Sequence, residues 1–257
     1  MANYYFLAAS LPSLTIGEKP EITFDELSSR LKINLSKKDF EKVVVLRRYV
    51  DIENVRYLLL DQPIEDRGNF SELELDEALL TFSGLPEYFF DFFAKYTTTE
   101  ERLRYFPEVF SSYFLEEAAK QKGFVHTYLT FERGVRLVLL ALRAKALRKD
   151  VFQELQFEDF TEPFIAQILA QKDMEMYEPP MEFTELKEIF TFTSHDPWER
   201  HRRIAEYRFT KIQEMVSKPL FSIEWILAYM LRLRIVEMWN EMSAEKGKEI
   251  VTSLAKI

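Results

Sequence analysis

The sequence contains no cysteine and only 6 glycines among its 257 residues. The lack of cysteine excludes disulfides, thiolate metal sites and a cysteine nucleophile. Glycine supplies the positive φ angles of tight turns, so six glycines are too few for a sheet with many hairpins or for glycine-rich phosphate loops. This shortage favours helices joined by short, capped connections.

The sequence also lacks the common catalytic and metal-binding patterns. His126, His195 and His201 form no His-x3-His pair, so no zinc site is expected. No Gly-x-Gly-x-x-Gly and no Gly-x4-Gly-Lys-Ser/Thr is present to cradle a phosphate. Ser194-His195-Asp196 has the residue types of a hydrolase triad, but consecutive residues cannot form its relay, and Ser194 or Asp196 is better interpreted as a helix cap. We therefore expect no catalytic residues and no cofactor.

Long apolar runs and an excess of positive charge are missing as well. No stretch reaches the roughly 18 apolar residues that a membrane-spanning helix needs, and the N-terminus lacks the basic region of a signal peptide. The net charge of −9 disfavours a nucleic-acid partner. These features predict a cytoplasmic chain with no direct membrane span.

What the sequence does contain indicates an all-α fold with an aromatic core. It has 23 Phe, 12 Tyr and 3 Trp, and apolar residues recur at helical spacing along most of its length. Thr23 with Glu26, and Ser71 with Glu74, form capping boxes that start helices. Residues 62–69 are predicted to be a loop, and Pro107 is expected to kink or split a helix over 99–120.

A weak repeat suggests how this single helical chain, 1–257, is organised. Residues 49–60, 129–140 and 226–237 are apolar with interspersed arginines, and the first two align at Val55-Arg56 and Val135-Arg136. Their spacing suggests three related lobes, 1–84, 85–175 and 176–257, although amphipathic helices also resemble one another by coincidence. Residues 176–183, which contain Pro179-Pro180, are the best linker candidate.

Three features could form interfaces. The segment Tyr88–Phe93 is aromatic on nearly all sides, so it is either central in the core or partly an interface. Basic residues cluster within 133–149 and again within 200–211. Such clusters either pair with neighbouring glutamates or dock an acidic protein surface. The candidate interface residues are Arg136, Arg143, Arg148, Arg200, Arg202, Arg203 and Arg208.

Two stretches carry a resemblance to known families. Tyr4–Leu14, followed by Gly17 and Pro20, is similar to the opening of an uncharacterised bacterial family encoded among V-type ATP synthase subunits, and the similarity continues through Arg47–Asn54. Ile226–Leu231, with Glu237 and Asn240 beyond, resembles the late helix of the socket subunit of V/A-type ATPases, which carries the letter C there and d in eukaryotic enzymes.

The resemblance implies a funnel-like array of three helical lobes and a structural function. The chain would be the rotor socket of a V-type ATPase central stalk, joining the central shaft to the membrane proteolipid ring during ion transport and ATP synthesis. It would be present once per complex, at the cytoplasmic side of the inner membrane and peripheral to it. The alternatives are an assembly or peripheral-stalk protein of the same complex, an unrelated helical adaptor, and a helical enzyme.

Overall fold

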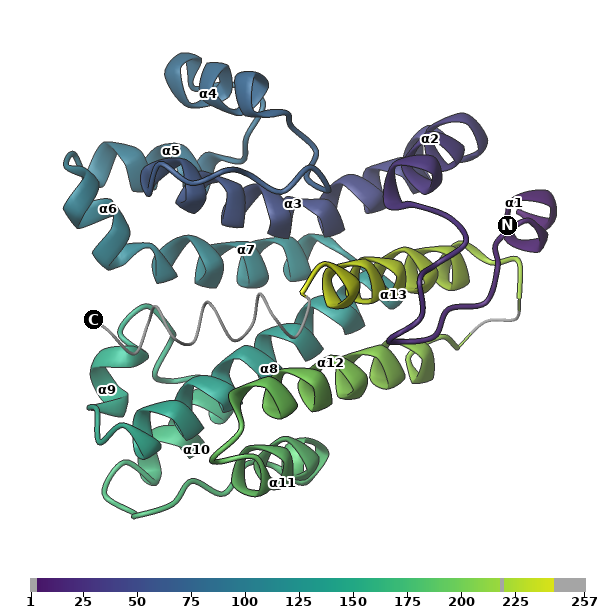
Figure 1. Cartoon of the computed structure of the whole chain (residues 1–257). Helices are drawn as coiled ribbons and strands as arrows, with labels where there is room; N and C mark the ends of the chain where they lie inside the picture. Colours follow the sequence, from purple (N-terminus) through teal and green to yellow (C-terminus); the bar gives the residue numbers. More distant parts are fainter. Residues whose placement is uncertain (1–3, 218–219, 243–257) are drawn as a thin grey trace. The chain divides into compact units, whose positions relative to one another are not determined.

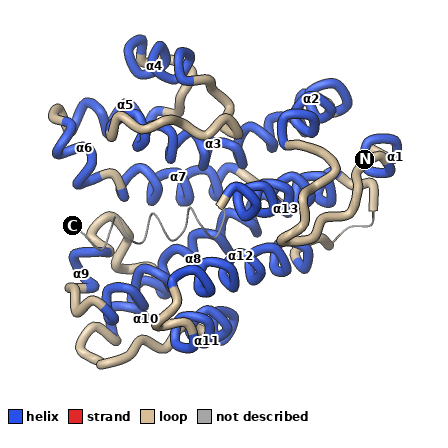
Figure 2. Tube along the Cα trace, in the orientation of Figure 1, coloured by secondary structure: helices blue, strands red, loops and turns tan. Residues whose placement is uncertain are grey.

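The computed structural model describes residues 4–217 and 220–242, and this part of the chain is helical without any strand (Figure 1, Figure 2). The predicted all-α fold is therefore confirmed. The chain divides into two compact units, of which unit 1 comprises residues 1–40 and 180–257 and unit 2 comprises residues 41–179. The boundary at 179/180 falls inside the expected linker. The three lobes and their funnel-like repeat stay predictions.

Unit 1 is built around its last described helix. Its elements are α1 (Tyr5–Ala9), α2 (Phe24–Asn34), η1 (Met181–Phe183), α11 (Thr184–Phe192), α12 (Pro197–Glu214) and α13 (Ile223–Glu241). Helix α13 packs against α2 and α12, and α12 also packs against α11. All six residues from Ile226 to Leu231 are buried. A helix that is buried on all sides occupies the centre of its unit.

Polar contacts fix the helix starts of unit 1. Thr23 and Glu26 form the predicted capping box at the start of α2, and Asp196 caps α12 by accepting a hydrogen bond from the Glu199 amide at 2.9 Å. The Phe24 amide donates to Glu237 Oε1 of α13 at 2.7 Å. The entry to α2 is thereby attached to the central helix.

Unit 2 is the aromatic unit. It contains α3 (Lys37–Leu59) from residue 41 onward, α4 (Glu72–Thr81), α5 (Glu87–Lys95), α6 (Thr99–Tyr105), α7 (Pro107–Lys120), α8 (Phe124–Ala146), α9 (Val151–Glu154) and α10 (Pro163–Ala170). Helix α7 packs against α5 and α8, and α8 packs against α9. The fully buried Tyr113 of α7 donates its hydroxyl to the Val45 carbonyl of α3 at 3.1 Å.

The predicted break at Pro107 is confirmed, and the aromatic segment lies mainly in the core. Helix α6 ends at Tyr105 and α7 begins at Pro107, because proline is accommodated in the first turn of a helix but not in its interior. In α5, Tyr88, Phe89 and Phe92 are buried, so the aromatic segment belongs mainly to the core. Among the described residues, no helix is both long and apolar enough to cross a membrane.

The predicted loop before α4 is held to α3 by buried polar groups. Asn69 donates to both carboxylate oxygens of Asp51, through its amide and its Nδ2, at 2.6 Å each. Asn54 exchanges two hydrogen bonds with the Glu65 backbone at 2.7 and 2.8 Å. Burial raises the pKa of Asp51, although the bonds from Asn69 act in the opposite direction. These contacts replace the water that α3 would otherwise bind here.

We expect Gly68→Ala to weaken this attachment. A Cβ at Gly68 would lie 2.6 Å from Asp51 Oδ1 and 3.0 Å from Asn54 Nδ2, so the loop or the carboxylate must shift. The expected loss is about 2 kcal/mol of unfolding free energy, the usual size for overpacking, measured by urea denaturation. Asp66→Ala, at an exposed position of the same loop, is the control and should change stability by less than about 0.5 kcal/mol. Equal stability of the two variants would contradict the account.

Candidate functional site

Unit 2 contains a pocket of about 460 Å³ that combines an apolar floor with a cationic rim. It lies among α3, α6, α7, α8 and α9, and we call it the cationic pocket. Its apolar lining consists of Leu103, Phe106, Pro107, Phe110, Leu140, Ala144 and Leu147. Its charged lining consists of five cations and one carboxylate, namely Arg56, Arg104, Arg136, Arg143, Lys149 and Glu154.

The rim cations differ in how firmly they are held. Arg56 and Arg104 are exposed, and the Arg104 guanidinium lies 5.5 Å from the centre of the Tyr105 ring. Lys149 forms an exposed ion pair with Glu154 at 3.5 Å. Exposed pairs of this kind contribute little to stability. These side chains can therefore reorient toward a ligand at small cost.

Arg136 is the anchored cation of the pocket. Its guanidinium donates to Glu158 Oε1 at 3.1 Å and to the Pro107 carbonyl at 3.4 Å. It also lies 5.8 Å from the centre of the Phe110 ring. These three contacts fix the side chain against α7, so Arg136 presents a positioned charge to the pocket.

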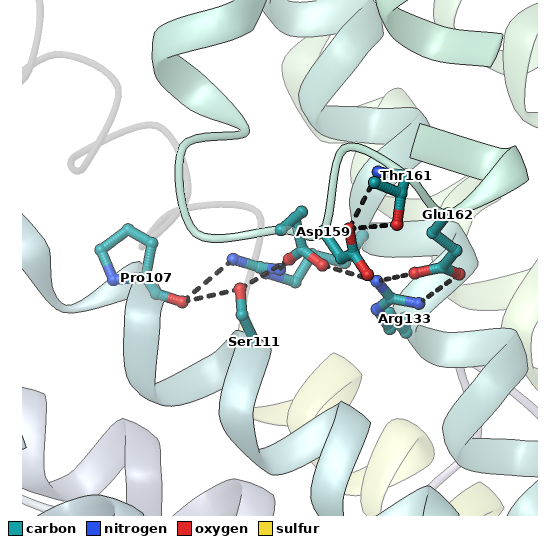
Figure 3. Close-up of polar contacts among 8 residues, drawn as sticks. Pro107, Ser111, Arg133, Asp159, Thr161 and Glu162 are labelled. Carbon is teal, nitrogen blue, oxygen red and sulfur yellow. Dashed lines mark hydrogen bonds and ion pairs between the residues drawn. The ribbon is translucent and has the colours of Figure 1, made fainter. Parts of the chain in front are cut away.

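The carboxylate that holds Arg136 belongs to a buried network, drawn in Figure 3. Glu158 also accepts hydrogen bonds from Arg133 at 2.7 Å and from the Ser111 hydroxyl at 2.6 Å. Figure 3 shows Glu162 directed at the guanidinium of Arg133, and two bonds of 2.7 and 2.8 Å join them. The network ties the segment before α10 to α7 and α8.

A local turn presents Glu158 and Glu162 to this network. Asp159 Oδ1 accepts from both the amide and the hydroxyl of Thr161, at 2.8 and 2.7 Å (Figure 3). These bonds lower the pKa of Asp159. Helix α10 follows with Pro163 at its first position and no side-chain cap. The Thr161 hydroxyl serves the turn and does not cap this helix.

Arg136 and Arg143, both singled out in the sequence, line the same pocket. Arg148 lies just beyond α8, is exposed, and does not line it. Arg56 and Arg104 were not among the candidates because they come from α3 and α6, far from α8 in the sequence. The alignment of Val55-Arg56 with Val135-Arg136 was the one signal that joined Arg56 to Arg136.

The second basic cluster lies on or beside α12 in unit 1, where carboxylates of the same helix bind two of its arginines. Arg202 forms ion pairs with Glu199 at 2.8 Å and Glu206 at 3.0 Å, and Arg203 pairs with Glu199 at 2.7 Å. The bonds from Arg202 and Arg203 lower the pKa of Glu199 to about 2. This is the ion pairing that the sequence left open as the alternative to an interface.

The other two candidate interface residues of this cluster are Arg200 and Arg208. Arg200 donates to the Thr193 carbonyl at 3.0 Å and lies over the Phe190 ring at 4.2 Å. Arg208 lies further along α12 and is half-buried. A hollow of about 540 Å³ beside α12 contains Arg202 and Arg203, but it also contains three glutamates. Its three glutamates outnumber its two arginines, so it is a weaker candidate for an anion than the cationic pocket.

The described part of the chain offers no group of three histidine, aspartate or glutamate side chains that could hold a metal ion. Asp196 of the Ser194-His195-Asp196 run serves as the cap of α12, which fits the simpler interpretation of that run. The apolar and cationic side chains that line the cationic pocket suit an anionic group that lies beside an apolar one.

Comparison with known proteins identifies a family but no function. A family model described as "Protein of unknown function (DUF2764)" matches residues 1–256. The chain is 29% identical over 262 residues to an uncharacterized protein of Chlamydia muridarum, which it covers over 98% of its length. It is 28% identical over 263 residues to an uncharacterized protein of Chlamydia trachomatis, again over 98% of that protein. Each alignment covers 100% of this chain. No solved structure matches.

The resemblance to a V-type ATPase family and to the ATPase socket subunit is therefore wrong. The family that matches is described only by its unknown function, and the Chlamydia relatives are described only as uncharacterized proteins. The stretch Ile226–Leu231, on which the comparison with the socket subunit rested, is buried in the centre of unit 1. An apolar pattern of this kind is required of any central helix and identifies no family.

We expect Glu158→Gln to destabilise the protein by about 3 kcal/mol, because the part-buried Arg136 loses its carboxylate partner and Arg133 keeps only Glu162. The side chain of Glu158 is 3% exposed, against 38% for Glu154 in its pair with Lys149. Glu154→Gln is therefore the matched control, and its expected effect is below about 1 kcal/mol. Urea denaturation of both variants measures the difference. A Glu158→Gln protein as stable as the control would show that the network does not hold unit 2 together.

Proposed function

Since the chain belongs to the DUF2764 family, whose description names no activity, we propose from the geometry of the pocket that it is a non-catalytic helical adaptor. The cationic pocket of unit 2 binds an acidic segment of a protein. A helical adaptor was one of the alternatives that the sequence analysis left open. The proposal now also names a binding site on the adaptor and the chemistry of its ligand.

The observation that carries the proposal is the charge imbalance of the pocket. Five cations and one carboxylate line it, in a chain whose net charge is −9. Glu158 binds Arg136 and Glu154 pairs with Lys149, so the exposed Arg56 and Arg104 carry most of the imbalance. Arginine forks match carboxylates in geometry and remain charged at all relevant pH values. The surroundings of the pocket therefore favour an anion, whereas most of the surface is expected to repel one.

The apolar floor supports a peptide ligand over a simple ion. Phe106, Phe110 and Leu140 would gain little from a small hydrated anion. A segment with acidic and apolar side chains next to each other satisfies both parts of the pocket. Exposed rim charges mainly raise the association rate and orient the partner, and burial on the floor then stabilises the complex.

The rotor-socket role stays a prediction, as do its partners, its single copy per complex and its location beside the membrane. The resemblance that suggested it has been corrected, so it is not the basis of the adaptor proposal. Co-elution of the purified chain with central-shaft subunits and solubilised proteolipid ring from its own organism would test that role separately.

The adaptor proposal is tested with a fluorescein-labelled peptide in which glutamates alternate with leucines. Fluorescence anisotropy should show binding that weakens with added salt, because the rim is exposed. Arg56→Glu with Arg104→Glu should weaken binding about tenfold or more, since two attractive contacts become repulsive. A peptide with glutamine in place of glutamate should bind far more weakly than the acidic one.

The matched control reverses two cations outside the pocket, Lys19→Glu with Lys122→Glu. Both lysines are exposed, and this variant has the same net charge as the pocket variant. It should bind the peptide nearly as well as the wild type. If both double variants bind the peptide equally weakly, the loss of affinity comes from the change in net charge. The pocket would then not be the binding site.

A further inference from the structure

Helix α4 has the opposite chemistry to the cationic pocket. It carries Glu72, Glu74, Asp76 and Glu77 and no lysine or arginine. Only Leu75 and Ala78 of this ten-residue helix are buried. An acidic helix is not a site by itself, but it is the type of segment that the pocket is proposed to bind.

The exposed side of α4 is apolar as well as acidic. Leu73 is 79% exposed and Leu80 is 81% exposed, and Phe82 after the helix is 57% exposed. Leu73 and Leu80 are seven residues apart, so they lie on the same face of the helix. Large apolar side chains that are this exposed, one helical repeat apart, form a face suited to a partner.

Helix α4 is already ordered in the isolated chain. Ser71 and Glu74 form a reciprocal capping box at its start, and the preceding 65–69 loop is bonded to α3. The Phe82 ring packs against Phe90 of α5 at 5.5 Å between centres. Docking of this helix would therefore cost little conformational entropy.

We infer that α4 of one copy of this chain docks against the cationic pocket of a second copy. The inference rests on the proposed function and names the partner. Acidic residues of α4 would face Arg56, Arg104 and Lys149, and Leu80 or Leu73 would contact the apolar floor and Leu147. Leu147 is 66% exposed at the rim of the pocket, so it offers apolar surface to such a helix.

The contact is between copies, because α4 does not reach the pocket of its own chain. No residue from 71 to 82 lines the cationic pocket, and Figure 1 shows α4 well apart from α8 and α9 within unit 2. An interface between two different surfaces leaves one pocket and one helix unused at the ends of every open assembly. Association therefore continues with concentration unless the rotation closes a ring.

Sedimentation velocity of the full chain tests the inference. The wild type should sediment faster as its concentration rises, and added salt should reverse this. Asp76→Lys with Glu77→Lys removes the acidic ligand, and Arg56→Glu with Arg104→Glu removes the site. All four residues are exposed, so both variants should fold, and each alone should remain a monomer.

Mixing the two variants gives the decisive result. The α4 variant retains a pocket and the pocket variant retains an acidic α4, so one contact can form and no further copy can be added. A one-to-one dimer in the mixture is the expected outcome. A wild type that is monomeric at every concentration overturns the inference.

Two further results distinguish this inference from the adaptor proposal. If both variants associate as strongly as the wild type, the contact lies elsewhere on the chain. That result overturns the role of α4. If the labelled acidic peptide binds the pocket while the chain does not associate, the adaptor proposal stands and only the self-association fails. The Lys19→Glu, Lys122→Glu protein should associate as the wild type does.

Discussion

One buried carboxylate holds together the part of unit 2 that contains the cationic pocket. Glu158 accepts hydrogen bonds from Ser111 of α7 and from Arg133 and Arg136 of α8. Burying this carboxylate costs free energy, which its two guanidinium partners offset. The turn at Asp159–Thr161 presents Glu158 to them, so a short irregular segment determines where Arg136 is directed.

The cationic pocket depends on this arrangement. Arg136 is its fixed charge, while Arg56 and Arg104 are exposed and can adapt to a ligand. The apolar floor from α6, α7 and α8 is the reason that we propose acidic segments with apolar side chains as ligands. Protein-binding surfaces commonly have an apolar centre and a polar rim. In this acidic chain the rim of the pocket is cationic.

The sequence predicted the local structure well and the site only in part. Capping residues, the break at Pro107 and the buried aromatics of α5 follow from short-range rules, so they were predictable. The pocket joins Arg56, Arg104 and Arg136 from three helices, and only tertiary packing brings them together. The arginines of α12 were equally basic in the sequence, but Glu199 binds Arg202 and Arg203.

The mistaken resemblance has a physical explanation. The apolar run Ile226–Leu231 reports burial in unit 1, and many unrelated helical proteins need such a run. Function is determined by particular sites rather than by the class of fold. The cationic pocket provides such a site, and Arg136 contributes to it through contacts that no helical pattern encodes.

Methyl NMR can show whether acidic segments bind in the cationic pocket. Leu103, Leu140 and Leu147 line the pocket, whereas Leu27 and Leu233 are buried in unit 1. On titration with the acidic peptide, the account predicts that methyl resonances of the three pocket leucines shift while those of Leu27 and Leu233 stay in place. Shifts confined to unit 1, or none at saturating peptide, would contradict it.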